Sequence, residues 1–166
     1  MRVYYNRFEV GSTITIKGRT DAAQIPPDLR EAIEILFTKE KLGAVFAEKN
    51  PNLVEFFGEG YGPKIQSGGY YAKQVGFVLY DVVIDRWWLI RDAVREIGEK
   101  LGVYVVPEIG IMEEAEIIAH VKSQPLGKFA LVQPHVAEGV VCRSEPLMLF
   151  RNGEPIKWKL KTKEFI

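Results

Sequence analysis

Hydrophobic and polar residues alternate along much of this chain, and alternation with a period of two is typical of β-strands. The segment from Arg2 to Arg19 contains two such stretches, one with Val3 and Tyr5 and one with Ile14 and Ile16. We predict two strands joined around Gly11-Ser12. The same reasoning predicts strands over 53–57, 76–84, 103–106, 138–143, 147–150 and 156–161. Asn152-Gly153 is a hairpin-type turn between the last two.

Three other segments have apolar residues at helical spacing. After Pro26-Pro27, the positions of Leu29, Ile33 and Leu36 predict a helix over 28–42, because proline is tolerated at a helix start. Further helices are predicted over 89–101 and 113–121. Neither an internal repeat nor a Gly/Ser linker interrupts the pattern. The sequence therefore predicts one α+β domain over 1–166, with mainly antiparallel sheets flanked by helices.

Composition narrows the class of protein. A chain of 166 residues with 47% hydrophobic residues is long and apolar enough to bury a core, which excludes a disordered chain. Cys142 is the single cysteine, so an internal disulfide is excluded. No stretch approaches 18 apolar residues, and the first residues lack a signal-peptide pattern, so we expect no membrane span and a cytoplasmic location.

The net charge is zero, with 22 Lys and Arg against 22 Asp and Glu, but the charges are separated along the chain. Residues 151–166 carry five cations against two acids, whereas residues 81–120 carry nine acids against four cations. Local excess charge, rather than the net value, decides which ligands a surface attracts. The net charge of zero therefore does not argue against a nucleic-acid partner.

Three common motifs are absent. The glycines at 58, 60 and 62 lack dinucleotide-binding spacing, and there is no P-loop sequence. The side chains that most often bind transition metals, His120, His135 and Cys142, stand alone in the sequence, and we interpret them as structural.

Three short segments carry chemistry in a less common form. Glu59 follows a predicted strand in Phe57-Gly58-Glu59-Gly60-Tyr61-Gly62, where glycines would let a ligand approach the backbone; a solvated turn is the alternative. Glu138 opens the otherwise apolar strand Glu138-Gly139-Val140-Val141. Lysines alternate with apolar residues in the segment KWKLK, residues 157–161, which places three ammonium groups on one face. The alternative there is an edge strand protected by lysines.

The order of these segments is more specific than any one of them. The chain contains IKGRT, FGEGYG, GFVLYDVVI, EGVV and KWKLK in that order, and in this it resembles the nucleotidyltransferase domain of ATP-dependent polynucleotide ligases, most closely the RNA ligase family. The resemblance covers essentially the whole chain. It implies the ATP-grasp-like nucleotidyltransferase fold of ligases and capping enzymes, with ATP (AMP) and Mg²⁺ as cofactors.

The resemblance also implies roles on the nucleoside side of a site. Arg19 matches an arginine that contacts the ribose and substrate phosphates, and Glu59 matches a glutamate that accepts a hydrogen bond from a ribose hydroxyl. Tyr80 matches the aromatic residue that stacks on adenine, a position more often occupied by phenylalanine in the family. Phe77 is the alternative for that role.

On the phosphate side, the resemblance places Glu138 near the metal and the nucleotide. Lys159 and Lys161 match paired lysines that contact the α-phosphate. These residue types suit the chemistry, because phosphoryl transfer depends on positioning and charge stabilisation, and Mg²⁺ binds few carboxylates and many waters.

One family motif is not found. Such ligases attack ATP with the lysine of a K-x-D-G motif, and none of the 13 lysines in this sequence begins one. The segment from Met1 to Tyr5 resembles the strand that follows that motif, so we expect a truncated domain that also lacks a C-terminal accessory domain. Such a chain would not adenylylate itself, although it would retain the groups needed to seal a pre-adenylylated end.

The expected partners are 5′-phosphate and 3′-hydroxyl ends of RNA, with DNA as an alternative, and no membrane. Self-association, or a complementary chain that supplies the missing segment, is a further expectation. Three hypotheses stay open at this point: a truncated RNA ligase, a non-catalytic nucleotide- or RNA-binding relic or part of a split ligase, and a structural protein that kept only the fold.

Overall fold

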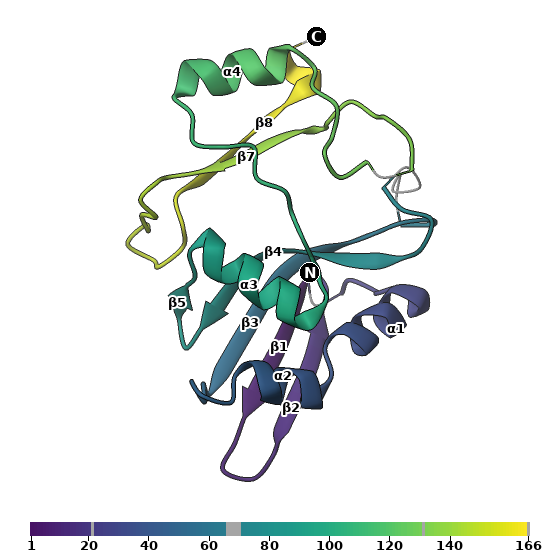
Figure 1. The fold of residues 1–166 in the computed structure, drawn as a ribbon, viewed down its shortest axis with the longest axis vertical. Helices are drawn as coiled ribbons and strands as arrows, with labels where there is room; N and C mark the ends of the chain where they lie inside the picture. Colours follow the sequence, from purple (N-terminus) through teal and green to yellow (C-terminus); the bar gives the residue numbers. More distant parts are fainter. Residues whose placement is uncertain (21, 66–70, 131, 166) are drawn as a thin grey trace. The chain divides into compact units, whose positions relative to one another are not determined.

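The computed structural model describes residues 1–20, 22–65, 71–130 and 132–165 (Figure 1). It divides into two compact units, Met1–Val106 and Pro107–Ile166, and each is described by itself below. The interpretation of 1–166 as one domain stays a prediction. Within the described ranges, no helix is both long and apolar enough to cross a membrane.

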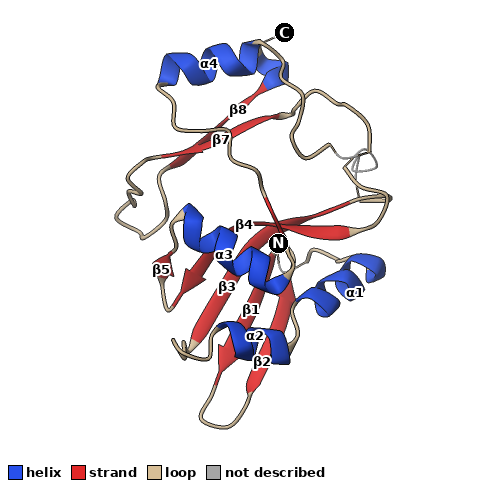
Figure 2. Ribbon diagram, viewed as in Figure 1, coloured by secondary structure: helices blue, strands red, loops and turns tan. Residues whose placement is uncertain are grey.

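The first unit is built on a twisted sheet (Figure 2). Its strands run in the order β2-β1-β3-β4-β5, and β6 pairs with β4 off this path. The β4–β6 pair is parallel, and the pairs β1–β2, β1–β3, β3–β4 and β4–β5 are antiparallel. The sheet is therefore mainly antiparallel, as the sequence predicts. The strands are β1 (Arg2–Arg7), β2 (Ser12–Lys17), β3 (Leu53–Tyr61), β4 (Gly76–Ile84), β5 (Trp87–Trp88) and β6 (Tyr104–Val105).

Three helices cover one face of this sheet: α1 (Pro27–Leu36), α2 (Lys39–Val45) and α3 (Arg91–Leu101) (Figure 1). Ile33, Leu42 and Val94 face the sheet from these helices and are fully buried. They pack with Phe56 of β3 and Leu79 of β4 in one hydrophobic cluster. Burial of apolar surface in this layer is the main source of stability for the unit.

The single helix predicted over 28–42 is wrong, because the chain leaves helical geometry at Phe37. The Phe37 ring is buried, 4.9 Å from the ring of Phe56 and 5.5 Å from that of Phe77. Thr38 then starts α2 as its N-cap, and its side chain accepts a hydrogen bond from the Lys41 backbone N–H at 3.3 Å. Packing of one aromatic ring therefore overrides helical spacing.

The second unit contains α4 (Glu114–Lys122), the hairpin of β7 (Gly139–Arg143) and β8 (Lys157–Lys161), and a 3₁₀ turn at Thr162–Glu164. Glu113 and Glu116 form a capping box at the start of α4, which satisfies two backbone N–H groups of its first turn. Val121 of α4 is fully buried, and the helix packs on β8.

The strand predicted over 147–150 is wrong. In that segment the structure has one isolated bridge, between Leu149 and Pro155. Proline has no backbone N–H to donate, so a ladder of hydrogen bonds cannot continue through Pro155. The chain instead forms an irregular extension of the hairpin that ends in the expected turn, where Gly153 has φ of +83° and donates its N–H to Phe150 O at 2.9 Å.

Candidate functional site

The first group of candidate residues lies where β3 and β4 change register. Phe57 pairs with Asp81 but Gly58 pairs with Leu79, so the ladder register between β3 and β4 skips Tyr80. This extra residue is a β-bulge, and it shifts the phase of β4: Leu79 before it and Val82 after it are both buried in the core. Tyr80, next to the core-facing Leu79, therefore lies on the face of the sheet opposite the helices, and the bulge allows Val82 to return to the core.

Glu59 lies on this same face. It follows the core-facing Phe56 by three residues in β3, and an odd separation along a strand places two side chains on opposite faces. The Tyr80 hydroxyl donates a hydrogen bond to the Glu59 carboxylate at 2.5 Å. The structure thus brings together an exposed carboxylate and a half-buried aromatic ring on neighbouring strands. Both groups were singled out from the sequence.

The glycines around Glu59 have a different function from the one expected. They belong to β3, which continues to Tyr61, and so Glu59 lies inside a strand rather than after one. A Cβ at Gly58 would lie 2.2 Å from Val78 O, and one at Gly60 would lie 2.3 Å from a methyl carbon of Leu29. These glycines are required for close packing of β3 on β4 and on α1.

Arg19 follows the end of β2 and is exposed. Its charge and that of Glu59 both act on the α-amino group of Met1, which donates a hydrogen bond to Gly58 O at 2.7 Å. Burial lowers the pKa of this ammonium group, the Glu59 carboxylate opposes the change, and the Arg2 and Arg19 guanidinium groups add to it. Arg19 and Glu59 therefore lie within electrostatic range of the same point.

The two aromatic candidates differ in accessibility. Phe77 has 1% of its surface exposed and packs edge-on against Phe37 in the core. Tyr80 is only partly buried and is turned away from that core. Of the two rings, a nucleobase can reach that of Tyr80.

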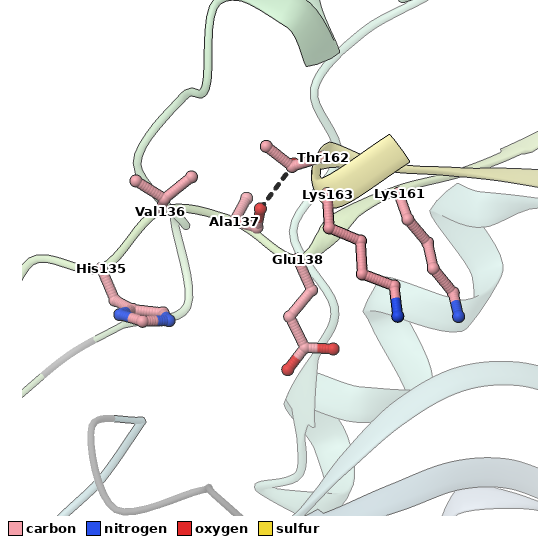
Figure 3. A pocket seen from close by; sticks show the side chains of 7 residues that line it. All are labelled: His135, Val136, Ala137, Glu138, Lys161, Thr162 and Lys163. Carbon is pink, nitrogen blue, oxygen red and sulfur yellow. Dashed lines mark hydrogen bonds between the residues drawn. The ribbon is translucent and has the colours of Figure 1, made fainter. Parts of the chain in front are cut away.

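The second group of candidate residues lies in the second unit, around an open hollow of about 370 Å³ (Figure 3). Figure 3 shows the side chains of Glu138, Lys161 and Lys163 projecting into the same region. The hollow therefore combines one carboxylate with two ammonium groups, which suits a ligand that carries phosphate and a cation. Its lining residues are His135, Val136, Ala137, Glu138, Lys161, Thr162 and Lys163.

Backbone contacts fix this arrangement. Thr162 donates its N–H to Glu138 O at 2.9 Å and its hydroxyl to Ala137 O at 2.7 Å. Gly139 has φ of +150°, and a Cβ there would lie 2.0 Å from Leu160 O. Only glycine allows β7 to approach β8 this closely, so Gly139 sets the distance between Glu138 and Lys161.

Lys159 does not line the hollow, although it shares a face of the hairpin with Lys161. The register pairs Val141 with Lys159 and Gly139 with Lys161. Val141 and Lys159 are both exposed. Lys159 is therefore displaced along the strand by two residues, roughly 7 Å.

The sequence interpretation overlooked Lys163 and took His135 as structural, yet both line the hollow. Lys163 continues the alternation of lysines at 157, 159 and 161, and this period was the available signal. His135 is isolated in the sequence and had no such signal. Burial raises the pKa of the Cys142 thiol, which makes it a poorer nucleophile and agrees with a structural role.

No cluster of three or more His, Cys, Asp or Glu side chains capable of holding a metal occurs among the residues that the structure describes. A cation at the hollow would have Glu138 as its protein ligand, with water and ligand phosphates as the others. This fits Mg²⁺, which keeps several waters and binds through one or two carboxylates plus phosphate oxygens. It does not fit a structural zinc site.

Comparisons with known proteins address the family and the fold. The family model described as RNA ligase matches residues 1–159. No curated protein sequence matches the chain. The fold is similar to solved structures of Naegleria gruberi RNA ligase, one with PPi (16% identity, TM-score 0.59) and one of a lysine-to-alanine mutant with ATP and Mn (16% identity, TM-score 0.61).

These alignments cover 99% of this chain but only 47% and 46% of the Naegleria chains. The chain thus spans about half the length of the structures it matches. The likeness establishes the α+β nucleotidyltransferase fold that the motifs predicted, with its antiparallel sheet and flanking helices.

Proposed function

The chain belongs to the RNA ligase family. We propose that it binds ATP or AMP and the 5′-phosphorylated ends of RNA for strand joining or RNA repair. The observation that carries the proposal is the shared hollow of Glu138, Lys161 and Lys163. Two ammonium groups beside one carboxylate match a phosphate with a bound divalent cation better than they match a neutral metabolite.

Each candidate residue has a physical role in this proposal. Lys161, Lys163 and, farther along the strand, Lys159 neutralise phosphate charge. When Mg²⁺ is bound, it would withdraw charge from the phosphate oxygens, and Glu138 would hold it. These groups act by position and charge, which are the main requirements of phosphoryl transfer.

In the first unit, the Tyr80 ring would stack on the base and the Glu59 carboxylate would accept a hydrogen bond from a ribose hydroxyl. Arg19 would contact the ribose and phosphates. The bulge at Tyr80 supports this assignment, because it presents the ring and the carboxylate on one face. Similar Naegleria ligase structures with ATP and Mn agree with ATP and a divalent cation as ligands.

A binding function without self-adenylylation is the second candidate. The residues that follow each lysine favour it, since none of the 13 lysines in this sequence begins a K-x-D-G motif. We propose that this chain by itself forms no covalent adduct with AMP, because an amine nucleophile of lowered pKa is indispensable to that step. It would act on pre-adenylylated ends or bind nucleotide without chemistry.

The test is a calorimetric titration of the full chain with ATP and Mg²⁺, together with denaturing electrophoresis after incubation with labelled ATP. We expect saturable binding that weakens about tenfold in Lys161→Ala or Glu138→Ala. The matched control is Lys100→Ala, an exposed lysine paired with Glu96 on α3. Equal affinities in all variants would overturn nucleotide binding, and a labelled protein band would overturn the non-covalent assignment.

A further inference from the structure

The basic face of the hairpin extends beyond the hollow. Residues paired directly across an antiparallel ladder lie on the same face. The pairs are Gly139 with Lys161, Val141 with Lys159 and Arg143 with Lys157. One face therefore carries four cations and no acid along both strands.

Val141 lies among these cations with 76% of its surface exposed. A nucleic acid strand, with apolar faces on its bases and charge on its backbone, matches such a mixture.

The loop that joins β7 to β8 continues the hairpin as an ordered extension. Backbone hydrogen bonds hold it, among them Ser144 N–H to Ile156 O at 3.3 Å, Ile156 N–H to Met148 O at 2.9 Å, and Phe150 N–H to Glu154 O at 2.8 Å. The tip is therefore positioned by its own backbone.

This tip presents apolar side chains outward. Met148, Leu149 and Phe150 are 52%, 47% and 54% exposed, and Arg151 follows them. The acids of the loop are Glu145 and Glu154, and both lie outside the paired strands. An exposed aromatic ring beside an arginine is a combination suited to stacking on a base.

We propose that the outer half of the hairpin binds a single-stranded RNA segment next to the end that is joined. Lys157 and Arg143 contact its phosphates, and the Phe150 ring stacks on one of its bases. Lysines two residues apart on a strand are roughly 7 Å apart, so the row from Lys161 to Lys157 follows an extended backbone. This inference rests on the proposed function, because the row of cations begins at Lys161, which lines the hollow proposed to bind the nucleotide phosphates.

The choice of RNA over a protein partner follows from charge. An apolar protein-binding surface is typically depleted of lysine at its centre, whereas this face is mostly lysine and arginine. Cations arranged in a row, with an aromatic ring at the end, are the features of single-strand binding surfaces.

The experiment measures binding of a fluorescent, 5′-phosphorylated oligoribonucleotide by anisotropy at several salt concentrations, without ATP. Each lost phosphate contact should reduce the slope of log affinity against log salt by about 0.7. We expect this change in Lys157→Ala and in Arg143→Ala. The control is Lys49→Ala, an exposed lysine of the first unit, which should leave slope and affinity unchanged.

Phe150 gives a separate readout. Phe150→Ala should weaken binding about fivefold or more with no change in slope, and Phe150→Tyr should restore it, because stacking needs the ring and not the charge. Phe150→Leu should behave like the alanine variant, which separates stacking from general apolar contact. Melting temperatures are measured for every variant, because Lys157 and Arg143 lie in the paired strands and a loss of RNA contacts must be separated from a loss of fold.

If the Lys157, Arg143 and Phe150 variants all bind RNA as the Lys49 variant does, the inference is overturned; a protein partner for the apolar tip would give that result. An ATP titration of the wild-type chain tests the proposed function separately. ATP binding together with unchanged RNA binding in the variants would overturn this inference alone. The expected RNA pattern without ATP binding would support the inference and overturn the proposed function.

Discussion

At the scale of single residues, the contact between Tyr80 and Glu59 depends on one inserted position. Without the bulge, β4 would keep its alternation, and either Tyr80 or Val82 would occupy the wrong face. The motif residues were visible in the sequence, but the bulge was not, because nothing in GFVLYDVVI marks where the register changes. Burial of Phe77 was equally hidden, since it depends on Phe37, 40 positions earlier.

The Tyr80 ring and the Tyr80 hydroxyl make separable contributions. We expect Tyr80→Ala to weaken ATP binding about fivefold or more, because base–aromatic stacking is lost. Tyr80→Phe should bind ATP within about threefold of wild type, because the ring remains and the Glu59 carboxylate gains a free lone pair for a ribose hydroxyl. Calorimetric titration checks both variants.

Phe77→Leu is the matched core control for that comparison. It should lower the melting temperature, since it alters the contact with Phe37, without a specific loss of nucleotide affinity in the folded protein. Weaker binding in Tyr80→Phe than in Tyr80→Ala would contradict the stacking role.

At the scale of elements, most strands were predictable from their alternating apolar residues, and the two helices after residue 88 were predictable from apolar residues at helical spacing. The failures have local causes. Phe37 leaves its helix to fill the core, and Pro155 cannot continue a ladder. β3 extends through FGEGYG because its glycines serve packing, whereas the sequence interpretation ended the strand at Phe57 and assigned the glycines to ligand approach, with a turn as the alternative. Tertiary contacts determine the local structure at each of these positions, and the local sequence pattern does not reveal those contacts.

The hairpin that carries Glu138 and Lys161 depends on Gly139. We expect Gly139→Ala to destabilise this hairpin by about 3 kcal/mol or more, because the new Cβ combines an unfavourable φ with a backbone clash. Urea denaturation followed by tryptophan fluorescence measures the change, with Trp158 of β8 reporting on the hairpin.

Gly153→Ala provides the control for backbone strain alone. Gly153 also has positive φ, +83°, but a Cβ there would meet nothing within 4 Å. Its substitution should cost about 1 kcal/mol. Equal costs at both positions would show that the close approach of β7 to β8 is not what Gly139 provides.

At the scale of the whole molecule, each unit is electrically neutral but the second is internally polarised. Residues 107–166 contain eight cations and eight acids. Three of the acids, Glu113, Glu114 and Glu116, lie at the start of α4, whereas the hairpin face is basic. A net charge of zero is therefore compatible with strong local attraction for phosphate.

The two units also differ in how much core they possess. The main hydrophobic cluster lies entirely within Met1–Val106. Among the described aliphatic and aromatic side chains of the second unit, Val121 alone is fully buried. A unit of this size with so little core is marginally stable by itself.

Hydrogen–deuterium exchange should reveal this difference. We expect the amides of β7 and β8 to exchange at least about 100-fold faster than those of β3 and β4, because regions with few buried apolar contacts open locally at lower free energy. Saturating ATP with Mg²⁺, at about 100 times its Kd, should slow exchange in the hairpin by up to about 100-fold, corresponding to about 2.7 kcal/mol of binding free energy. Lys161→Ala should abolish much of this protection while leaving β3 and β4 unchanged. Uniform exchange across both units would instead mean that they unfold as one cooperative structure, and that the small core of the second unit does not set its stability.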